Sequence, residues 1–288
     1  MKGFFKPLQF FTSILLLSSF ALANEVSINV GMLNLPGEYK HEKYTDKYTN
    51  GTKIGSQSEQ ASKDLDINVM TVRINSMKPT GIKNLQYGAE FGFSSTANLE
   101  LRKFENPAST NITSGIFENE DPYYDALSSY VTKKYEKTLD VNVLPLMGKV
   151  SYDLISNDVY SLNAGMGLGV YTYLMNRKEK TTYTCVKDSS PIKTGDVVIS
   201  ESNSNEVIIK PAVELNIAGN YNLTKNIFIG LNAGLVSIEK YIDKNVSTIN
   251  RYTDYADSTK YDRAVQSETK TEIGGLGYNI GLNIGAKF

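Results

Sequence analysis

The chain has 288 residues, of which 41% are hydrophobic and 21% charged, and its formal net charge is −1. This near-neutral balance argues against a nucleic-acid-binding protein, which would carry a strongly basic face. A single cysteine excludes a disulfide within one molecule, and no apolar run after residue 23 is long enough for a membrane-spanning helix.

The first 23 residues have the pattern of a secretory signal peptide. Lys2 and Lys6 give a positively charged start, residues 8–20 are mostly apolar, and Ala21-Leu22-Ala23 fits a cleavage site. The only cysteine is Cys185, so no lipobox cysteine follows the apolar stretch, and we expect no lipoprotein anchor. We therefore expect residues 24–288 to form the mature protein as a single domain.

Eight segments of the mature chain alternate apolar and polar residues, which predicts β-strands with one apolar face. They lie near residues 25–35, 65–77, 85–95, 139–154, 159–175, 207–223, 227–238 and 275–288. In the second segment the apolar alternation passes from Val69 to Val72, and in the fourth it slips near Val143 and Pro145. Each slip predicts a β-bulge.

The connections between these segments fall into two classes. Three are short and rich in turn residues, at 78–84, 155–158 and 224–226, and they alternate with four long polar segments. The long segments are residues 36–64, 96–138, 176–206 and 239–274. In an up-and-down barrel, alternate connections lie at the same rim. Short periplasmic turns and longer extracellular loops are typical of outer-membrane barrels.

The combined pattern predicts an all-β fold, an antiparallel up-and-down transmembrane β-barrel of eight strands. Both termini would then be periplasmic, and the four long loops would be extracellular. Ten strands remain the alternative, if residues 96–138 contain a hairpin. A soluble β-sandwich would need two sheets that bury one face in a shared core, and it would not explain the asymmetry of the loops.

The long segments are expected to be mostly mobile loops, because they are polar and contain few apolar residues. Residues 98–104 and 129–135 keep a partial alternation, which predicts that two strands extend beyond the membrane as a hairpin. Such an extension would offer an edge for β-augmentation by a partner strand.

The last twelve residues alternate without a break and end on an aromatic residue. Their apolar face includes Tyr278, Ile280, Leu282, Ile284 and Phe288. This strand resembles the C-terminal assembly signal of bacterial outer-membrane barrels. We therefore expect these five residues to be needed for insertion.

Two internal segments strengthen a family resemblance. Leu144-Pro145-Leu146 leads to Tyr152, and after a tight turn the glycines alternate as Gly165-x-Gly167-x-Gly169. With the terminal strand, this arrangement resembles the small eight-stranded outer-membrane barrels of the OmpA transmembrane-domain, OmpX and Opa type. The resemblance implies contact with the lipid bilayer and lipopolysaccharide, assembly by the barrel assembly machinery, and no nucleic-acid partner.

Charged residues recur on the faces opposite the apolar ones. Arg73, Glu90, Lys149, Lys210 and Glu214 are predicted to face the lumen. An eight-stranded barrel is just wide enough for side chains to fill, so we expect these charges to pair as a plug. The alternative is a polar conduit whose width is left open by inward glycines.

The sequence offers no set of catalytic residues, and we expect no enzyme activity, no cofactor and no metal. His41 is the only histidine, and we place it on a solvated loop, although a pairing with Glu42 or Asp46 could act in acid–base catalysis. Cys185 falls in the third long segment, where we interpret it as an incidental thiol. Pairing of Cys185 between molecules is the alternative.

These features favour an outer-membrane surface protein whose barrel is an anchor. Its extracellular segments would serve adhesion, contact with host or matrix molecules, or shielding of the surface. The alternative is a small porin-like channel for small solutes. The family contains adhesins, pores and a few enzymes, so the resemblance does not choose between these roles.

Overall fold

The computed structural model describes residues 24–49, 52–106, 131–187, 194–254 and 261–288. The predicted signal peptide, residues 1–23, lies outside the described residues. Nothing helical in the described residues has the length and apolar character needed to cross a membrane. The strands are β1 (Glu25–Thr49), β2 (Thr52–Pro79), β3 (Leu85–Ser94), β4 (Ala97–Asn106), β5 (Val131–Ser156), β6 (Tyr160–Cys185), β7 (Val197–Asn222), β8 (Ile227–Asp254) and β9 (Tyr261–Lys287).

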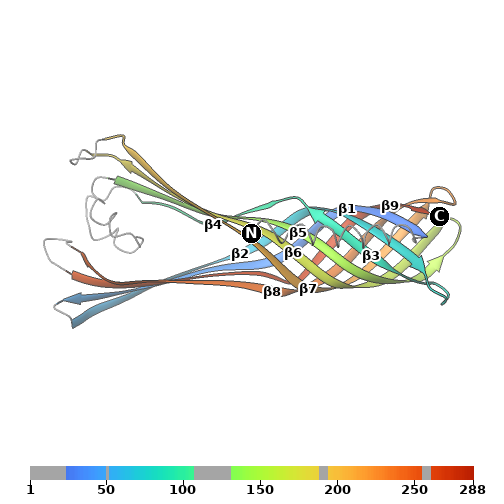
Figure 1. Ribbon diagram of the computed structural model, residues 1–288, viewed down its shortest axis with the longest axis horizontal. Coiled ribbons are helices and arrows are strands. Elements are labelled where there is room, and N and C mark those ends of the chain that lie inside the picture. The colour runs from blue at the N-terminus through green and yellow to red at the C-terminus, as the bar shows by residue number, and fades with distance from the viewer. Residues whose placement is uncertain (1–23, 50–51, 107–130, 188–193, 255–260) are drawn as a thin grey trace, which may run out of the picture.

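Antiparallel pairings close these strands into a ring (Figure 1). β2 pairs with β1, β1 with β9, and the ring continues through β8, β7, β6 and β5. β3 then pairs with both β5 and β2, which completes an eight-membered barrel. β4 continues from β3 and pairs with β5, so it adds no member to the ring. The predicted eight-stranded antiparallel barrel is confirmed.

A short break separates β3 from β4 at Ser95 and Thr96. The hydroxyl of Ser94 accepts a hydrogen bond from the backbone N–H of Val143 at 2.7 Å. The side-chain amide of Asn142 donates to the Thr96 hydroxyl at 2.9 Å. Side chains thus replace the interrupted backbone ladder against β5.

The short turns lie together at one end of the barrel, as the sequence predicts (Figure 1). The backbone N–H of Asn222 donates to the carbonyl oxygen of Val159, which ties two turns together. The backbone N–H of Phe288 donates to the carbonyl oxygen of Asn24 at this same end. Both ends of the described chain after residue 23 are therefore fixed on the turn side.

An apolar girdle surrounds the barrel. Large apolar side chains with exposures of 40–62% alternate along the outer face of each strand of the ring. A continuous apolar surface of this extent is the property of a protein that contacts lipid or a partner. The girdle includes Ile28, Val30, Met32, Met70, Tyr87, Phe93, Leu146, Val150, Tyr152, Met166, Leu168, Val213, Leu215, Ile217, Ile229, Leu231, Leu235, Tyr278, Ile280, Leu282 and Ile284.

The two predicted bulges are wrong. The register of β1 with β2 runs without a shift from Glu25 to Lys47, and that of β5 with β6 from Val131 to Asp153. Ile67 and Val69 are buried on the same face of β2 as Arg73, and Val143 is buried on the same face of β5 as Lys149. The side chains inside the barrel therefore change from charged to apolar along one straight strand face, and the backbone does not slip.

Most of the four long segments are strand, which corrects the expectation of mobile loops. β1 continues to Thr49 and β2 begins at Thr52, so residues 36–49 and 52–64 pair as two long strands. Residues 239–254 of β8 and 261–274 of β9 pair in the same way. Polar side chains do not oppose this structure, because the backbone groups of neighbouring strands satisfy one another.

Beyond the barrel the sheet divides into two four-stranded arms (Figure 1). The first arm, residues 37–49, 52–70, 239–254 and 261–273, has the strand order β2-β1-β9-β8. The second arm, residues 97–106, 131–140, 176–187 and 194–211, has the order β4-β5-β6-β7. The division arises because β7 pairs with β8 only up to Ala212 and Ile238, and β2 with β3 only up to Thr71 and Ser94.

The first arm leaves the barrel at a glycine bulge in β9. Gly274 and Gly275 have φ angles of +107° and +115°, in a region that side chains other than glycine rarely adopt. The register of β9 shifts here against both neighbours, opposite Pro36 of β1. Pro36 has no N–H for the ladder, so the irregular backbone on both strands bends the sheet at this point.

We predict that the part of the barrel interior nearest the arms behaves as a hydrophobic core. Leu35→Ala should lower the free energy of unfolding by about 2–5 kcal/mol, because Leu35 is fully buried and leaves a cavity. Met32→Ala, on the outer face of the same strand, is the matched control and should cost much less in detergent micelles. Equal losses in denaturant titrations would contradict an inward core.

Candidate functional site

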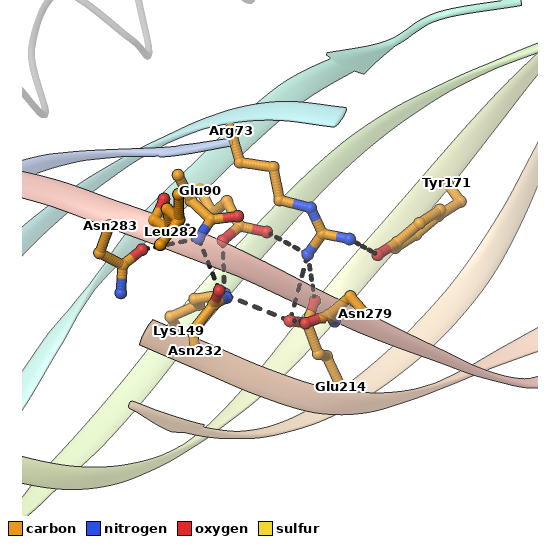
Figure 2. A network of polar contacts seen from close by, with 10 residues as sticks. Arg73, Glu90, Lys149, Tyr171, Glu214, Asn232, Asn279, Leu282 and Asn283 are labelled. Atoms are coloured by element: carbon orange, nitrogen blue, oxygen red, sulfur yellow. Dashed lines mark hydrogen bonds and ion pairs between the residues drawn. The ribbon is translucent and has the colours of Figure 1, made fainter. Parts of the chain in front are cut away.

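Four buried charges from four strands meet inside the barrel (Figure 2). Arg73 of β2 lies 3.1 Å from Glu90 of β3 and 3.1 Å from Glu214 of β7. Lys149 of β5 lies 2.5 Å from Glu90 and 3.5 Å from Glu214. Each cation contacts both anions, so this charge cluster is neutral and crosses the lumen from wall to wall.

Neutral side chains add hydrogen bonds to the charge cluster, although the Nε of Arg73 has no partner. Arg73 donates through Nη2 to the hydroxyl of Tyr171 at 3.2 Å, and Asn279 donates to Glu214 at 3.0 Å. The side chains of Arg73, Glu90 and Glu214 are at most 2% exposed. Buried ions are stable only when they are paired and hydrogen-bonded, and this arrangement provides both.

A polar cavity of about 60 Å³ lies between the charge cluster and the turns. Its lining is rich in asparagine and also includes Glu90 and Lys149. Asn29 donates to Asn232 at 2.6 Å and to Asn283 at 2.7 Å, which links the neighbouring strands β1, β9 and β8 along the inner wall. The cavity has room for a few water molecules and for no larger solute.

An apolar core fills the lumen on the other side of the charge cluster. Its members are nearly all less than 10% exposed and come from all the strands of the ring except β3, and from β4. This core includes Leu33, Leu35, Ile67, Val69, Leu139, Val141, Val143, Met147, Tyr171, Tyr173, Met175, Val236, Ile238 and Ile273. The interior is therefore blocked twice in succession, by paired charges and by packed apolar side chains.

The inward glycines do not hold a conduit open. A Cβ atom at Gly285 would collide with the ring of Phe228, and one at Gly281 would collide with the side chain of Asn29. Glycine is needed at these positions so that neighbouring side chains can cross the narrow lumen. The alternative of a conduit kept open by inward glycines is therefore wrong at these positions, because neighbouring side chains fill the space beside the glycines.

Three other residues that the sequence analysis singled out, Lys210, His41 and Cys185, are not part of the charge cluster. Lys210 lies outside the charge cluster and pairs with Glu239 at 2.9 Å, beyond the last β7–β8 backbone pair. His41 is buried on β1 and is 1% exposed, so the expectation of a solvated loop is wrong. Cys185 is buried at the end of β6 and its thiol contacts the carbonyl oxygen of Lys187.

Side chains connect the two arms where they leave the barrel. Tyr241 of β8 donates to Glu206 of β7 at 2.7 Å, Arg177 of β6 pairs with Asp243 of β8, and Lys210 pairs with Glu239. We call these six residues the cross-arm latch. Burial and the bond to Glu206 raise the pKa of the Tyr241 hydroxyl well above its usual range, so it remains a donor at neutral pH.

Each arm has an open backbone edge on both sides. β2 and β8 are the outer strands of the first arm, and β4 and β7 are those of the second arm. The predicted edge near residues 98–104 is thus present on β4. Residues 133–135 of β5 pair with both β4 and β6, so they form no edge, and residues 129–130 lie outside the described residues.

Further contacts stiffen the second arm on the face continuous with the barrel interior. The rings of Phe104 and Tyr135 stack at 5.2 Å, and the guanidinium of Arg102 lies 4.9 Å from the centre of the Phe104 ring. Lys137 pairs with Glu179 at 2.6 Å on the neighbouring strands. The arms are thus ordered β-sheet with aromatic and charged side chains available for contact.

The sequence identified all four charges of the cluster and missed their neutral partners. Tyr171 follows Gly165, Gly167 and Gly169 at the same period of two, so strand parity alone would have placed it inside. Of the latch residues, only Lys210 lies in a predicted strand, and the other five gave no comparable signal because they lie in polar segments without clear alternation. Within the described part of the chain, no group of three or more His, Cys, Asp or Glu residues suits a metal ion.

Comparisons with known proteins give distant structural likenesses. No protein-family model matches the sequence, and no curated protein matches it. Three solved structures resemble the fold: the outer membrane protein OprG from Pseudomonas aeruginosa, Ail from Yersinia pestis bound to the heparin analogue sucrose octasulfate, and Neisserial surface protein A.

The extent of these likenesses is similar for the three structures. OprG is 10% identical with a TM-score of 0.36, and the match covers 91% of this chain and 96% of OprG. Ail is 10% identical (TM-score 0.25, 86% and 97% covered), and Neisserial surface protein A is 9% identical (TM-score 0.27, 88% and 97% covered). At these values the likenesses carry no role over to this chain.

We predict that Glu214→Gln strongly destabilises the barrel. It leaves Arg73 and Lys149 opposite a single carboxylate, and breaking a buried ion pair costs about 3–5 kcal/mol. Glu239→Gln breaks the exposed pair with Lys210 and should cost less than about 1 kcal/mol. Thermal unfolding in micelles measures both, and similar losses would contradict the structural role of the cluster.

Proposed function

We propose that this protein is a bacterial outer-membrane surface protein whose barrel anchors two projecting arms. The apolar girdle supports placement in a bilayer, because all ladder bonds of the wall are closed and the outer face is apolar. The short turns would face the periplasm and the arms would face outward, as in barrels with short periplasmic turns. Lipopolysaccharide and the barrel assembly machinery are then expected partners.

The observation that carries the proposal is the contrast between a filled barrel and two ordered arms. A barrel that only closed its strands would need short connections at both rims. Here β1, β2, β8 and β9 of the first arm and β4 to β7 of the second arm continue as paired sheet well beyond the girdle. Rigid sheets with aromatic and charged side chains provide preorganised contact surfaces, which favours adhesion to host or matrix molecules.

The porin-like alternative is less well supported. A conduit would need continuous water from the turns to the arms, yet the charge cluster and the apolar core occupy successive levels of the lumen. The cavity near the turns ends at Glu90 and Lys149. A solute would have to break buried ion pairs and then cross a dry core.

We therefore predict little steady conductance for the purified protein in planar bilayers. Neutralising Glu90 should lower stability and should not create a graded channel, because the apolar core remains. Large and stable openings in the unmodified protein, whose conductance changes in Glu90→Gln, would favour the channel.

We predict that the arms mediate attachment. In one variant short turns replace residues 38–63 and 240–273, which removes the first arm; in the other they replace 97–139 and 177–209, which removes the second. Both should retain a barrel that shows heat-modifiable gel mobility, and at least one should lower attachment of cells to host or matrix surfaces. The matched pair shows which arm binds.

Two outcomes would revise this proposal. Unchanged attachment in both variants, with the barrel intact, would leave the arms as a shield of the cell surface. Loss of the folded barrel in both variants would show that the arms are needed for folding, and point substitutions on the arms would then have to replace the deletions.

A further inference from the structure

The outer edge of β7 differs from the other three open edges. Over residues 197–211, β7 pairs with β6 on one side, and no strand among the described residues pairs with its other side. Natural proteins protect such edges with lysine or other charges, which prevent pairing with another chain. β2 carries Lys53 and Lys63, β4 carries Lys103, and β8 carries Lys240 and Lys244. Residues 197–209 of β7 contain no lysine or arginine; their only charges are Glu201 and Glu206, and Lys210 and Pro211 follow at the base of the arm.

This lysine-free stretch, residues 197–209, is also apolar at both ends. Val197, Val198 and Ile199 are 53–63% exposed near the tip of the second arm. Val207 and Ile209 are 48% and 52% exposed near its base. Between these ends lie only serine, asparagine and glutamate. An edge with this composition is open to strand addition.

The order of residues in this stretch is nearly palindromic around Asn203. In an antiparallel pair of two copies centred there, Val197 faces Ile209, Val198 faces Ile208 and Ile199 faces Val207. Ser202 faces Ser204, and Glu201 faces Asn205, so no glutamate opposes a glutamate. Residues that face each other in such a ladder lie on the same side of the sheet and interact directly.

We propose that the β7 edge is a self-association surface that pairs with the β7 edge of a second copy. The occupant follows from self-complementarity: a two-fold axis at Asn203 matches apolar with apolar and polar with polar along the whole stretch. Such a contact is isologous, with the same patch used by both copies. It joins two four-stranded second arms into one eight-stranded sheet.

The geometry of this pairing places the two barrels at opposite ends of the joined sheet. Two β7 strands that pair antiparallel point their barrels in opposite directions, and the two Ala212 residues would lie about 60 Å apart at roughly 3.3 Å per residue. Copies in one membrane cannot meet this condition, because their strands are parallel. The pairing therefore joins opposing membranes, and it rests on the proposed function in which the arms project from the cell.

The base of the edge is partly occupied by the latch. Glu206 and Lys210 contact Tyr241 and Glu239 of β8, so pairing at Val207 and Ile209 requires β8 to move aside. Weakening the latch should promote self-association. Tyr241→Phe removes the hydroxyl that donates to Glu206 without changing the size of the ring.

Disulfide cross-linking of the full-length protein in detergent micelles tests the register. In Asn203→Cys, the two cysteines face each other across the axis, with Cα atoms about 5 Å apart, which suits a disulfide. In Asn205→Cys, on the same face, they would be about 13 Å apart, beyond the reach of a disulfide. We expect cross-linked dimers for Asn203→Cys, more of them with Tyr241→Phe, and none for Asn205→Cys or the unmodified chain.

The rate at which cells that display the protein settle from suspension tests the contact between copies on opposing membranes. Ile199→Lys places a charge opposite Val207 twice per dimer and should lower self-association by about tenfold or more. Ile242→Lys is the matched control, with a similarly exposed isoleucine on β8, and should settle like the parent. Absence of Asn203→Cys cross-links in both latch backgrounds, or equal cross-linking of the two cysteine variants, would overturn the proposal. Attachment to matrix surfaces is a separate readout, so either idea can fail alone.

Discussion

Closure of the sheet by β3 is the constraint on which the rest of the molecule depends. β3 pairs with β2 on one side and with β5 on the other, so the barrel wall has no free edge. A wall that lies in lipid must satisfy every backbone group within itself, because no water is present to do so. Closure then imposes a period of two on every strand, with one face toward lipid and the other toward a narrow lumen. Outward side chains can be apolar without exception, whereas inward ones must pair or pack.

The same constraint explains why the arms begin where they do. Outside the girdle, water can satisfy an open edge, and the ring no longer has to close. The β7–β8 pairing ends at Ala212 and Ile238, close to the last girdle residue of β7, Val213. The glycine bulge at Gly274 and Gly275 and the break at Ser95 fall near the same level and let the two halves of the sheet diverge. Among the described residues, open edges thus occur only outside the closed ring.

The outer face of the barrel could be predicted from the sequence and the inner face only in part. Outward residues such as Leu282 and Leu231 face one uniform environment, so their alternation is regular. Inward residues face one another, and Val69 and Val143 belong to an apolar core that follows directly on Arg73 and Lys149. An analysis of alternation assigns all apolar residues of a strand to one face. Where both faces of a strand carry apolar residues, it therefore predicts a shift in register that the strand does not have.

Apart from the predicted hairpin extension near residues 98–104, which β4 and β5 form, the arms escaped prediction for a different physical reason. Their strands carry lysine, glutamate, serine and threonine on both faces, and such segments resemble loops when burial is the only criterion. The backbone ladder holds them together regardless, as the full pairing of β1 with β2 shows. His41 illustrates the consequence: a histidine assigned to a solvated loop lies buried on β1, because the strand continues through it.

The two polar clusters of the molecule differ in what it takes to open them. The charge cluster is almost fully buried, so separating Arg73 from Glu214 leaves each ion with one counter-ion instead of two in a buried interior, at a cost of several kcal/mol. In the latch, the Lys210 and Glu239 side chains are 21% and 58% exposed, and a pair of this kind contributes about 1 kcal/mol or less. The Arg177–Asp243 pair of the latch is less exposed, at 15% and 16%, so opening the latch costs more than this one pair, yet it leaves the closed barrel wall intact. A rigid anchor with separable arms lets surface contacts form without disturbing the membrane-spanning part.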